Sequence, residues 1–145
     1  MFIEKTKEAL KDKRITNKTY NKVVNEDTII SSWWDFGYIF EYASDHQVTF
    51  DGGTQSGERA FWIGKAIATD NLDLSVGIFR MLNNGGTKAG TYMYDINHDN
   101  DLNTQILVHI LPLSSSEARN SLIKDYHFTT AQADQIIKYT HPDNP

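Results

Sequence analysis

Apolar residues recur at helical spacing through the C-terminal two thirds of the chain. Residues 57–69 carry them at positions 60, 61, 63, 67 and 68, and residues 72–83 carry them at 74, 78, 81 and 82. This spacing places an apolar stripe on one face of a helix. We therefore predict two buried helices here, with the second ended by the glycines after Asn84, and a third buried helix over residues 102–111.

Two further helices are marked by the residues that open them. Ser114 is followed three positions later by Glu117, and Thr129 is followed three positions later by Gln132. Both pairs match the capping box, in which two side chains satisfy the first free N–H groups of a helix. We predict helices that start at these sites and end near residues 126 and 139, and an amphipathic helix over residues 2–13.

Two short apolar runs predict strands. Residues 28–30 are β-branched, and residues 47–50 end at a Gly-Gly pair that suits a turn. Residues 38–44 between them indicate one or two helical turns, so the two strands are expected to pair in parallel. The predicted fold class is α+β, a mostly helical single domain with a small two- or three-stranded sheet.

Residues 83–103 are rich in Gly, Asn and Asp, which favours turns over regular structure. Within this stretch, oxygen-bearing side chains alternate as they do in a calcium loop, at Asp95-x-Asn97-x-Asp99-x-Asp101. Asn100 stands where an EF-hand needs Gly, and Ile106 stands where it needs a bidentate Glu. We expect a solvated acidic turn that binds calcium weakly or not at all.

The rarest local sequence is Ser-Ser-Trp-Trp-Asp-Phe-Gly-Tyr at residues 31–38, in a chain with only three Trp. If it follows a strand and Gly37 lets the chain turn, Trp33, Trp34 and Asp35 meet around one point. They would form a polar pocket walled by indole, suited to a hydroxyl or amide group. The alternative is that both tryptophans are core residues and Asp35 caps a turn.

The composition of the chain argues against several classes of function. A net charge of −5 with 14 Lys and Arg argues against a nucleic-acid partner, and the absence of Cys excludes disulfides, thiol catalysis and cysteine-ligated metal. There is no apolar stretch near 18 residues and no signal peptide, so the chain by itself is expected to be soluble. No catalytic set or phosphate loop is present. His109, within an apolar helix, is expected to be a hydrogen-bonded core residue.

Residues 33–37, Trp-Trp-Asp-Phe-Gly, resemble the Trp-Trp-Asp-Tyr-Gly signature of the catalytic subunit of oligosaccharyltransferase. That membrane enzyme moves a lipid-linked glycan onto asparagine. Phe36 replaces the usual Tyr. Three later segments are also similar to prokaryotic members, namely Asp-Gly-Gly-Thr-Gln at 51–55, Gly-Lys-Ala at 64–66 and Tyr-Thr-His-Pro at 139–142. The resemblance covers about residues 24–145.

The resemblance implies a role for the Trp cluster. Trp33, Trp34 and Asp35 would contact the Ser/Thr hydroxyl of an Asn-x-Ser/Thr acceptor peptide. Residues 1–145 would be one soluble domain, a fragment of a larger multi-pass membrane protein, on the extracytoplasmic side of the cell membrane. The full-length enzyme would use a divalent cation, Mn or Mg, whose ligands lie outside this chain. This chain would hold no catalytic residue and no metal, and would be inactive alone.

The implied partners are the acceptor peptide and, through the missing membrane part, the lipid-linked oligosaccharide. A second family motif, Met-x-x-Ile, matches residues 93–96 by letter, but the stretch is rich in turn residues. We therefore expect the true motif beyond Pro145. The alternative function is a noncatalytic carbohydrate- or calcium-binding module, in which Trp33 and Trp34 stack on sugar and residues 95–101 hold calcium.

Overall fold

A computed structural model describes residues 29–142 of the chain. The helix predicted over residues 2–13 lies outside the described residues, as does position 28 of the first predicted strand. The chain divides into two compact units, residues 1–55 and residues 56–145. Each unit is described by itself below.

The described part of the first unit contains one helix, α3 (Trp34–Ser44), and an extended segment on each side of it. Ile30 and Val48 form a single parallel bridge, in which the Ile30 N–H donates to the Gln47 carbonyl at 2.9 Å and the Thr49 N–H donates to the Ile30 carbonyl at 2.9 Å. The extended runs are short, because α3 begins at Trp34 and a turn begins at Asp51.

The predicted fold class is therefore wrong. The parallel direction of the pairing matches the prediction, but residues 29–142 hold this isolated bridge and no strand or sheet. A sheet needs several consecutive residues in each strand to build a ladder of backbone hydrogen bonds. The runs at 28–30 and 47–50 do not continue far enough to form one, and the described chain is helical.

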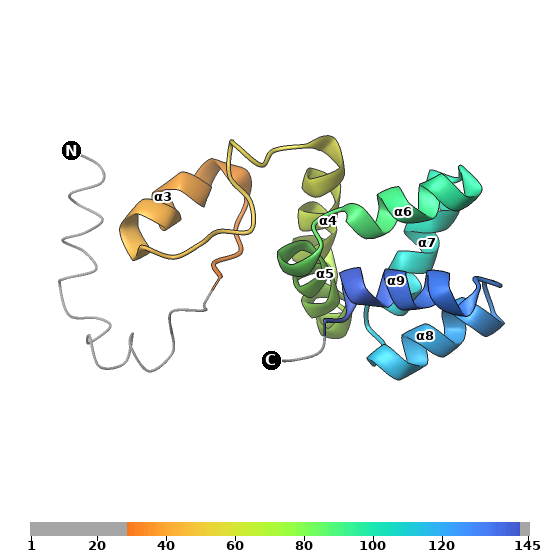
Figure 1. The fold of residues 1–145 in the computed structure, drawn as a ribbon. Coiled ribbons are helices and arrows are strands. Elements are labelled where there is room, and N and C mark those ends of the chain that lie inside the picture. Colours follow the sequence, from red (N-terminus) through yellow and green to blue (C-terminus); the bar gives the residue numbers. More distant parts are fainter. Residues whose placement is uncertain (1–28, 143–145) are drawn as a thin grey trace. The chain divides into compact units, whose positions relative to one another are not determined.

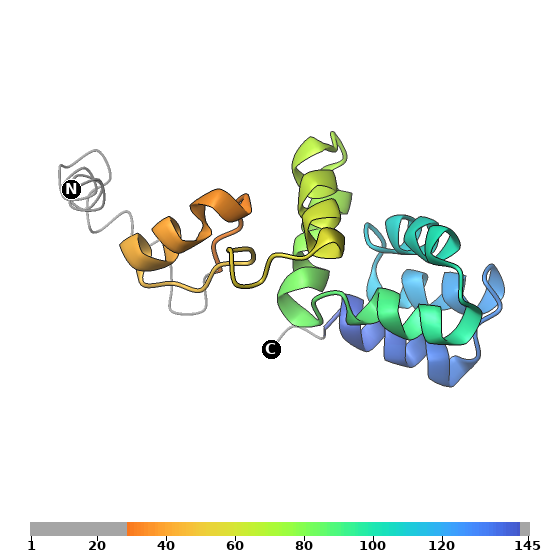
Figure 2. The same cartoon turned by 90° about the horizontal axis from the view of Figure 1, so that it is seen from above.

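The second unit is a bundle of six helices within the described residues (Figure 1). They are α4 (Gly57–Ala68), α5 (Leu72–Asn84), α6 (Lys88–Asn97), α7 (Asn100–Ile110), α8 (Ser115–Lys124) and α9 (Thr130–Thr140). α9 packs against α5, α6 and α8, while α4 packs on α5 and α7 packs on both α6 and α8. Figure 2 shows α4 and α5 at one end of this bundle and α6 to α9 at the other.

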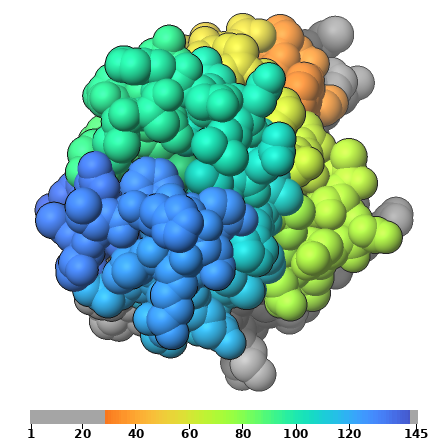
Figure 3. All heavy atoms as spheres, turned by 90° about the vertical axis from the view of Figure 1, so that its right-hand side faces the viewer, coloured from red at the N-terminus to blue at the C-terminus, as the bar shows by residue number. Residues whose placement is uncertain are grey.

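The core of the second unit includes the face of α5 that the helical spacing predicts, since Leu74, Ile78, Met81 and Leu82 are buried. The face predicted for α4 is wrong, because α4 buries Trp62, Ile63 and Ala66 and leaves Phe61, Ile67 and Ala68 exposed. Ile63, Ile78, Ile106 and Ile136 from four different helices are all fully buried. In the view of Figure 3, the atoms of α6 to α9 form most of the face turned toward the reader. Burial of apolar side chains is worth about 1.5–3 kcal/mol each and is the main force that holds the bundle.

Both predicted capping boxes are confirmed. The Ser114 N–H donates to the Glu117 carboxylate at 3.1 Å, and the Glu117 N–H donates to the Ser114 hydroxyl at 3.3 Å. The Thr129 N–H donates to Gln132 Oε1 at 2.9 Å, and the Gln132 N–H donates to the Thr129 hydroxyl at 3.3 Å. These bonds begin α8 and α9 where the sequence predicts them.

The prediction of irregular structure over residues 83–103 is wrong, because α6 and the start of α7 occupy it. Ala89 and Met93 lie one helical turn apart and are both fully buried, and the Tyr92 ring meets the Tyr139 ring of α9 edge to face at 6.4 Å. These contacts outweigh the weak helix propensity of the segment. The Met-x-x-Ile match at residues 93–96 therefore lies in a helix, although the composition of this stretch favours turns.

His109 is also not a core residue. It lies on the exposed side of α7, and its Nδ1 atom is 2.7 Å from the Tyr126 hydroxyl. The apolar residues of α7 that are buried are Ile106, Leu107 and Ile110, so the helix turns His109 toward solvent. The apolar run alone did not reveal this, because its residues cover more than one face.

Arg80 links three parts of the second unit. Its Nε–H donates to the Thr140 carbonyl at 3.1 Å and its Nη2–H donates to the Leu111 carbonyl at 2.9 Å. Gly77, one turn earlier on α5, lies so close to Leu111 that an added Cβ would collide with the Leu111 backbone. The arginine therefore satisfies carbonyl groups at the ends of α7 and α9.

Candidate functional site

The Trp cluster (Trp33, Trp34 and Asp35) lies at the N-terminus of α3 rather than at the end of a strand. Trp33 has extended backbone and is the N-cap residue, while Trp34 and Asp35 are the first two helical residues. Trp33 is 36% exposed, Trp34 is half-buried and Asp35 is exposed. Neither tryptophan is fully buried, and Asp35 does not cap a turn among the described residues.

Residues 47–51 hold the helix that carries the cluster. The Trp33 ring packs edge to face on the buried Phe50 ring, with ring centroids 5.9 Å apart and planes at 82°. Gly37 is buried, and a Cβ at this position would collide with the Phe50 carbonyl and with the backbone of Asp51. Gly37 therefore serves close helix packing rather than the turn that its position in the sequence suggests.

The Asp51–Thr54 turn continues this support. The Asp51 carboxylate accepts hydrogen bonds from the Thr54 N–H at 2.7 Å and from the Thr54 hydroxyl at 2.9 Å. The ring of Tyr38 lies against Gly52 and Gly53, where a Cβ would come 3.0 and 3.1 Å from it. The Asp-Gly-Gly-Thr segment thus packs against α3, and its glycines leave room for the Tyr38 side chain.

The polar groups of the Trp cluster are available to a ligand within the described part of the chain. No hydrogen bond or ion pair among residues 29–142 engages the Asp35 carboxylate or either indole N–H of Trp33 and Trp34. Asp35 also lies in the first turn of α3, where the free N–H groups of the helix stabilise negative charge. Asp35 provides an acceptor and the two indoles provide donors, and these are groups that can bind a hydroxyl or an amide.

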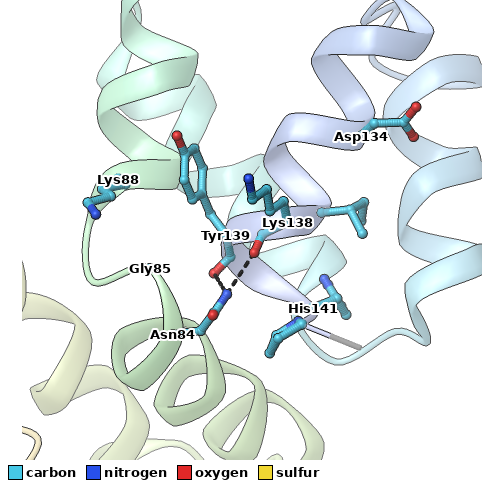
Figure 4. A pocket seen from close by; sticks show the side chains of 9 residues that line it. Asn84, Gly85, Lys88, Asp134, Lys138, Tyr139 and His141 are labelled. Carbon is cyan, nitrogen blue, oxygen red and sulfur yellow. Dashed lines mark hydrogen bonds between the residues drawn. The ribbon is translucent and has the colours of Figure 1, made fainter. Parts of the chain in front are cut away.

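Two pockets lie in the second unit. One, of about 460 Å³, lies along the seam between α5 and α9 (Figure 4). Its Asn84 amide donates to the carbonyls of Lys138 at 2.7 Å and Tyr139 at 3.0 Å, and its Asp134 pairs with Arg119 at 2.6 Å. The hydrogen bond from Arg119 lowers the pKa of Asp134. These groups join helices to one another, so the pocket is a structural seam.

The other pocket, of about 690 Å³, is lined by α4, α6 and α7. It mixes two exposed aromatic side chains, Phe61 and Tyr94, with amides, hydroxyls and carboxylates. Asn100 and Asp101 fall within the run at residues 95–101 that the alternative function gives to calcium, and none of its other residues was a predicted site residue. The sequence gives no signal for it, because the apolar spacing counts Phe61 in the predicted buried face of residues 57–69 and Tyr94 lies in the stretch predicted to be irregular.

Metal-binding chemistry is not apparent in the described residues. Residues 29–142 contain no group of three or more His, Asp or Glu side chains placed to hold a metal ion. The acidic run is divided between two helices, because Asp99 caps α7 through the Leu102 N–H at 2.9 Å. Asn97 is paired with Asn103 by two amide hydrogen bonds of 2.7 and 2.9 Å. The described helices are also all too short or too polar to cross a membrane.

Comparison with known proteins decides the family. The family model of the STT3/PglB/AglB core domain matches residues 25–135. The chain belongs to this family. The matched region includes the Trp cluster and most of the second unit, so it extends over parts of both units.

Two curated relatives agree with this assignment. Over 123 residues, or 82% of this chain, the sequence is 41% identical to the dolichyl-phosphooligosaccharide-protein glycotransferase of Methanocaldococcus jannaschii. Over 126 residues, or 84% of this chain, it is 36% identical to the protein of the same name from Methanococcus voltae. The matched part spans only 13% and 14% of those relatives, so the chain corresponds to a small portion of each. No solved structure matches the chain.

Proposed function

We propose that this chain is the acceptor-recognition part of an oligosaccharyltransferase. The full-length protein would transfer a lipid-linked glycan to the asparagine of an Asn-x-Ser/Thr sequence in an acceptor protein. Membership of the STT3/PglB/AglB core family and the names of two glycotransferase relatives support this class of activity. The recognition role depends on the geometry of the Trp cluster.

The single observation that carries the role is the state of Asp35. Its carboxylate is exposed at the first turn of α3, and no described residue bonds to it. An acceptor hydroxyl can donate to this carboxylate while accepting from the indole N–H of Trp33 or Trp34. The packing of Trp33 on Phe50 and of Gly37 against residues 50–51 holds these groups in place before the peptide arrives.

The chemical step would take place elsewhere in the full-length protein. By family resemblance, the divalent cation, Mn or Mg, would be held by acidic residues in loops of a membrane-embedded part. The domain would lie on the extracytoplasmic side of the cell membrane as a fragment of a multi-pass protein. The lipid-linked oligosaccharide would bind to that other part, and this chain alone would not catalyse transfer.

The proposal is tested by transfer to paired peptides, Asn-x-Thr against Asn-x-Val, in the full-length enzyme. A pocket that bonds to a substrate hydroxyl can reject the analogue without it by about 10⁴-fold. Asp35→Ala should lower transfer to the Thr peptide steeply and reduce this discrimination. Glu41→Ala is the matched control, because it removes another exposed carboxylate from the same helix.

Phe36→Tyr restores the residue usual in the family and should leave transfer unchanged, since the Phe36 side chain is 53% exposed. If Asp35→Ala kept both the rate and the preference for Thr, the cluster would not read the hydroxyl. Transfer by the isolated 145-residue chain, given lipid-linked glycan and the Thr peptide, would contradict the proposal that the chemical step takes place in another part of the full-length protein.

A further inference from the structure

The pocket between α4, α6 and α7 has the size and lining of a ligand site. Its volume of about 690 Å³ falls within the range of about 300–1,000 Å³ that is usual for small-molecule sites. It lies entirely in the second unit, which does not carry the Trp cluster. The pocket is therefore formed without any residue of the Trp cluster.

Two aromatic side chains are exposed at this pocket. Phe61 of α4 is 48% exposed and Tyr94 of α6 is 41% exposed, while the neighbouring Trp62 is buried and packs edge to face on Phe61 at 5.1 Å. An exposed aromatic ring loses part of the free energy that burial would give. Here two such rings border one pocket, where they can cover the apolar C–H surface of a ligand.

Several other lining side chains are neutral groups that can form hydrogen bonds. Asn100, Gln105 and Thr104 of α7 and Thr91 of α6 offer both donors and acceptors. Two carboxylates, Glu58 and Asp101, add acceptors, and the lining contains no Lys, Arg or His. This composition suits a ligand with many hydroxyl groups. The two carboxylates disfavour an anion, even though Lys65 Nζ lies over the Phe61 ring, 6.0 Å from its centroid.

Glu58 is held at the wall of the pocket by its surroundings. Its Oε1 atom lies so close to Gly90 that a Cβ there would come within 2.9 Å. Burial raises the pKa of Glu58, and a hydrogen bond from Thr87 lowers it. A side chain larger than glycine at position 90 would push the Glu58 carboxyl group away from this position.

We propose that this pocket binds a neutral saccharide. Phe61 and Tyr94 would lie against the sugar ring, while the α7 amides, Asp101 and Glu58 would bond to its hydroxyls. A peptide is a poorer match, because the described residues offer no strand edge for an added strand and the lining is too polar for the apolar face of a helix.

The experiment is a titration of the isotope-labelled 145-residue chain, followed by ¹H–¹⁵N NMR. The probes are methyl glucoside and methyl N-acetylglucosaminide as neutral sugars, and methyl glucuronide as the anionic counterpart. A ligand this small should bind with a dissociation constant of the order of millimolar. The shifted resonances should come from residues of α4, α6 and α7, and the glucuronide should bind more weakly than the neutral sugars.

Three variants sharpen the test. Tyr94→Ala and Phe61→Ala should each weaken binding by about fivefold or more, because they remove an aromatic contact from an exposed position. Gln105→Ala, also exposed, tests the polar wall without touching a ring. Ile67→Ala is the matched control, since Ile67 lies on α4 and is exposed but does not line the pocket.

The proposal is overturned if no neutral sugar shifts these resonances at tens of millimolar, if the glucuronide binds as well, or if the pocket variants bind like Ile67→Ala. It is also overturned if Trp33→Ala abolishes sugar binding, because the saccharide would then occupy the Trp cluster. None of these results bears on the paired-peptide experiment. Failure of the saccharide site and failure of acceptor recognition are therefore distinguishable.

Discussion

The second unit and the described part of the first unit differ in how many of their apolar side chains they bury. In the second unit, the apolar side chains of six helices meet in a common core, and many of them are fully buried. In the described part of the first unit, Phe50 is the one buried aromatic residue, while α3 leaves five aromatic side chains exposed, at Trp33, Phe36, Tyr38, Phe40 and Tyr42. The second unit buries much of its apolar surface in a core, whereas the described part of the first unit leaves much of its apolar surface exposed.

This difference bears on how the described part of the first unit is stabilised. A segment with few buried side chains gains little stability from its own core, so it depends on close backbone packing instead. Gly37 against residues 50–51 and the Asp51–Thr54 hydrogen bonds provide such packing. Mutations should therefore have large effects in the second unit and local effects in the first.

The largest effect is expected from the core of the second unit. Ile136→Ala removes a fully buried side chain of α9 and should lower the free energy of unfolding by about 2–5 kcal/mol. Phe36→Ala, at an exposed position of α3, should change it by less than about 1 kcal/mol. Urea unfolding followed by far-UV circular dichroism measures both. Equal costs for the two variants would refute the contrast between the units.

A pH-dependent effect is expected at His141, which is only 4% exposed. Burial, and then the charge of Arg80, lower its pKa from 6.5 to about 4. Between these values the unfolded chain binds a proton that the folded chain does not, so stability present above pH 6.5 is lost as pH falls toward 4.

Replacing the imidazole should flatten this dependence. In the neutral ring, Nε2–H donates to the Leu113 carbonyl at 3.2 Å, and Nδ1 lies 2.8 Å from the Thr140 hydroxyl. Between pH 7 and 4.5 the wild type should lose about 1–3 kcal/mol more stability than His141→Gln. Urea unfolding at several pH values measures the difference. Parallel curves for the two proteins would show that His141 does not titrate in this range.

A local effect is expected at Gly37. Gly37→Ala places a methyl group against the backbone of Phe50 and Asp51, which should cost about 1–3 kcal/mol within the first unit. Hydrogen exchange should quicken in residues 30–50 and stay unchanged in α5 and α9. Gly57→Ala is the control, because a Cβ at Gly57 meets nothing within 4 Å. Faster exchange throughout the second unit would mean that the two units unfold together.

The smallest effect is expected at a helix start. Thr129→Ala removes the cap of α9 and should cost about 1 kcal/mol, whereas Thr130→Ala, one position later, should be nearly neutral. The thermal midpoints of the two variants give the comparison. A larger loss for Thr130→Ala than for Thr129→Ala would contradict the assigned cap.

Local interactions explain which elements could be predicted. Ser114 with Glu117, and Thr129 with Gln132, reach each other across one turn, so their bonds depend only on nearby residues. The rarity of adjacent tryptophans likewise drew attention to Trp33 and Trp34 without any structure, and the family assignment agrees with that resemblance. Their contact with an acceptor hydroxyl stays a prediction.

Other features depend on residues far apart in the chain. The sequence by itself determined the apolar face of α5 and the caps of α8 and α9, and the resemblance at residues 33–37 pointed to the family that the family model shows. Tertiary packing decided the rest. α6 forms because Met93 is buried and Tyr92 meets Tyr139, and Arg80 is held by carbonyls 31 and 60 residues away. Residues differ in helix preference by roughly a few tenths of a kcal/mol, which is less than the free energy gained by burying side chains and by satisfying carbonyl groups. Such contacts therefore override local propensity.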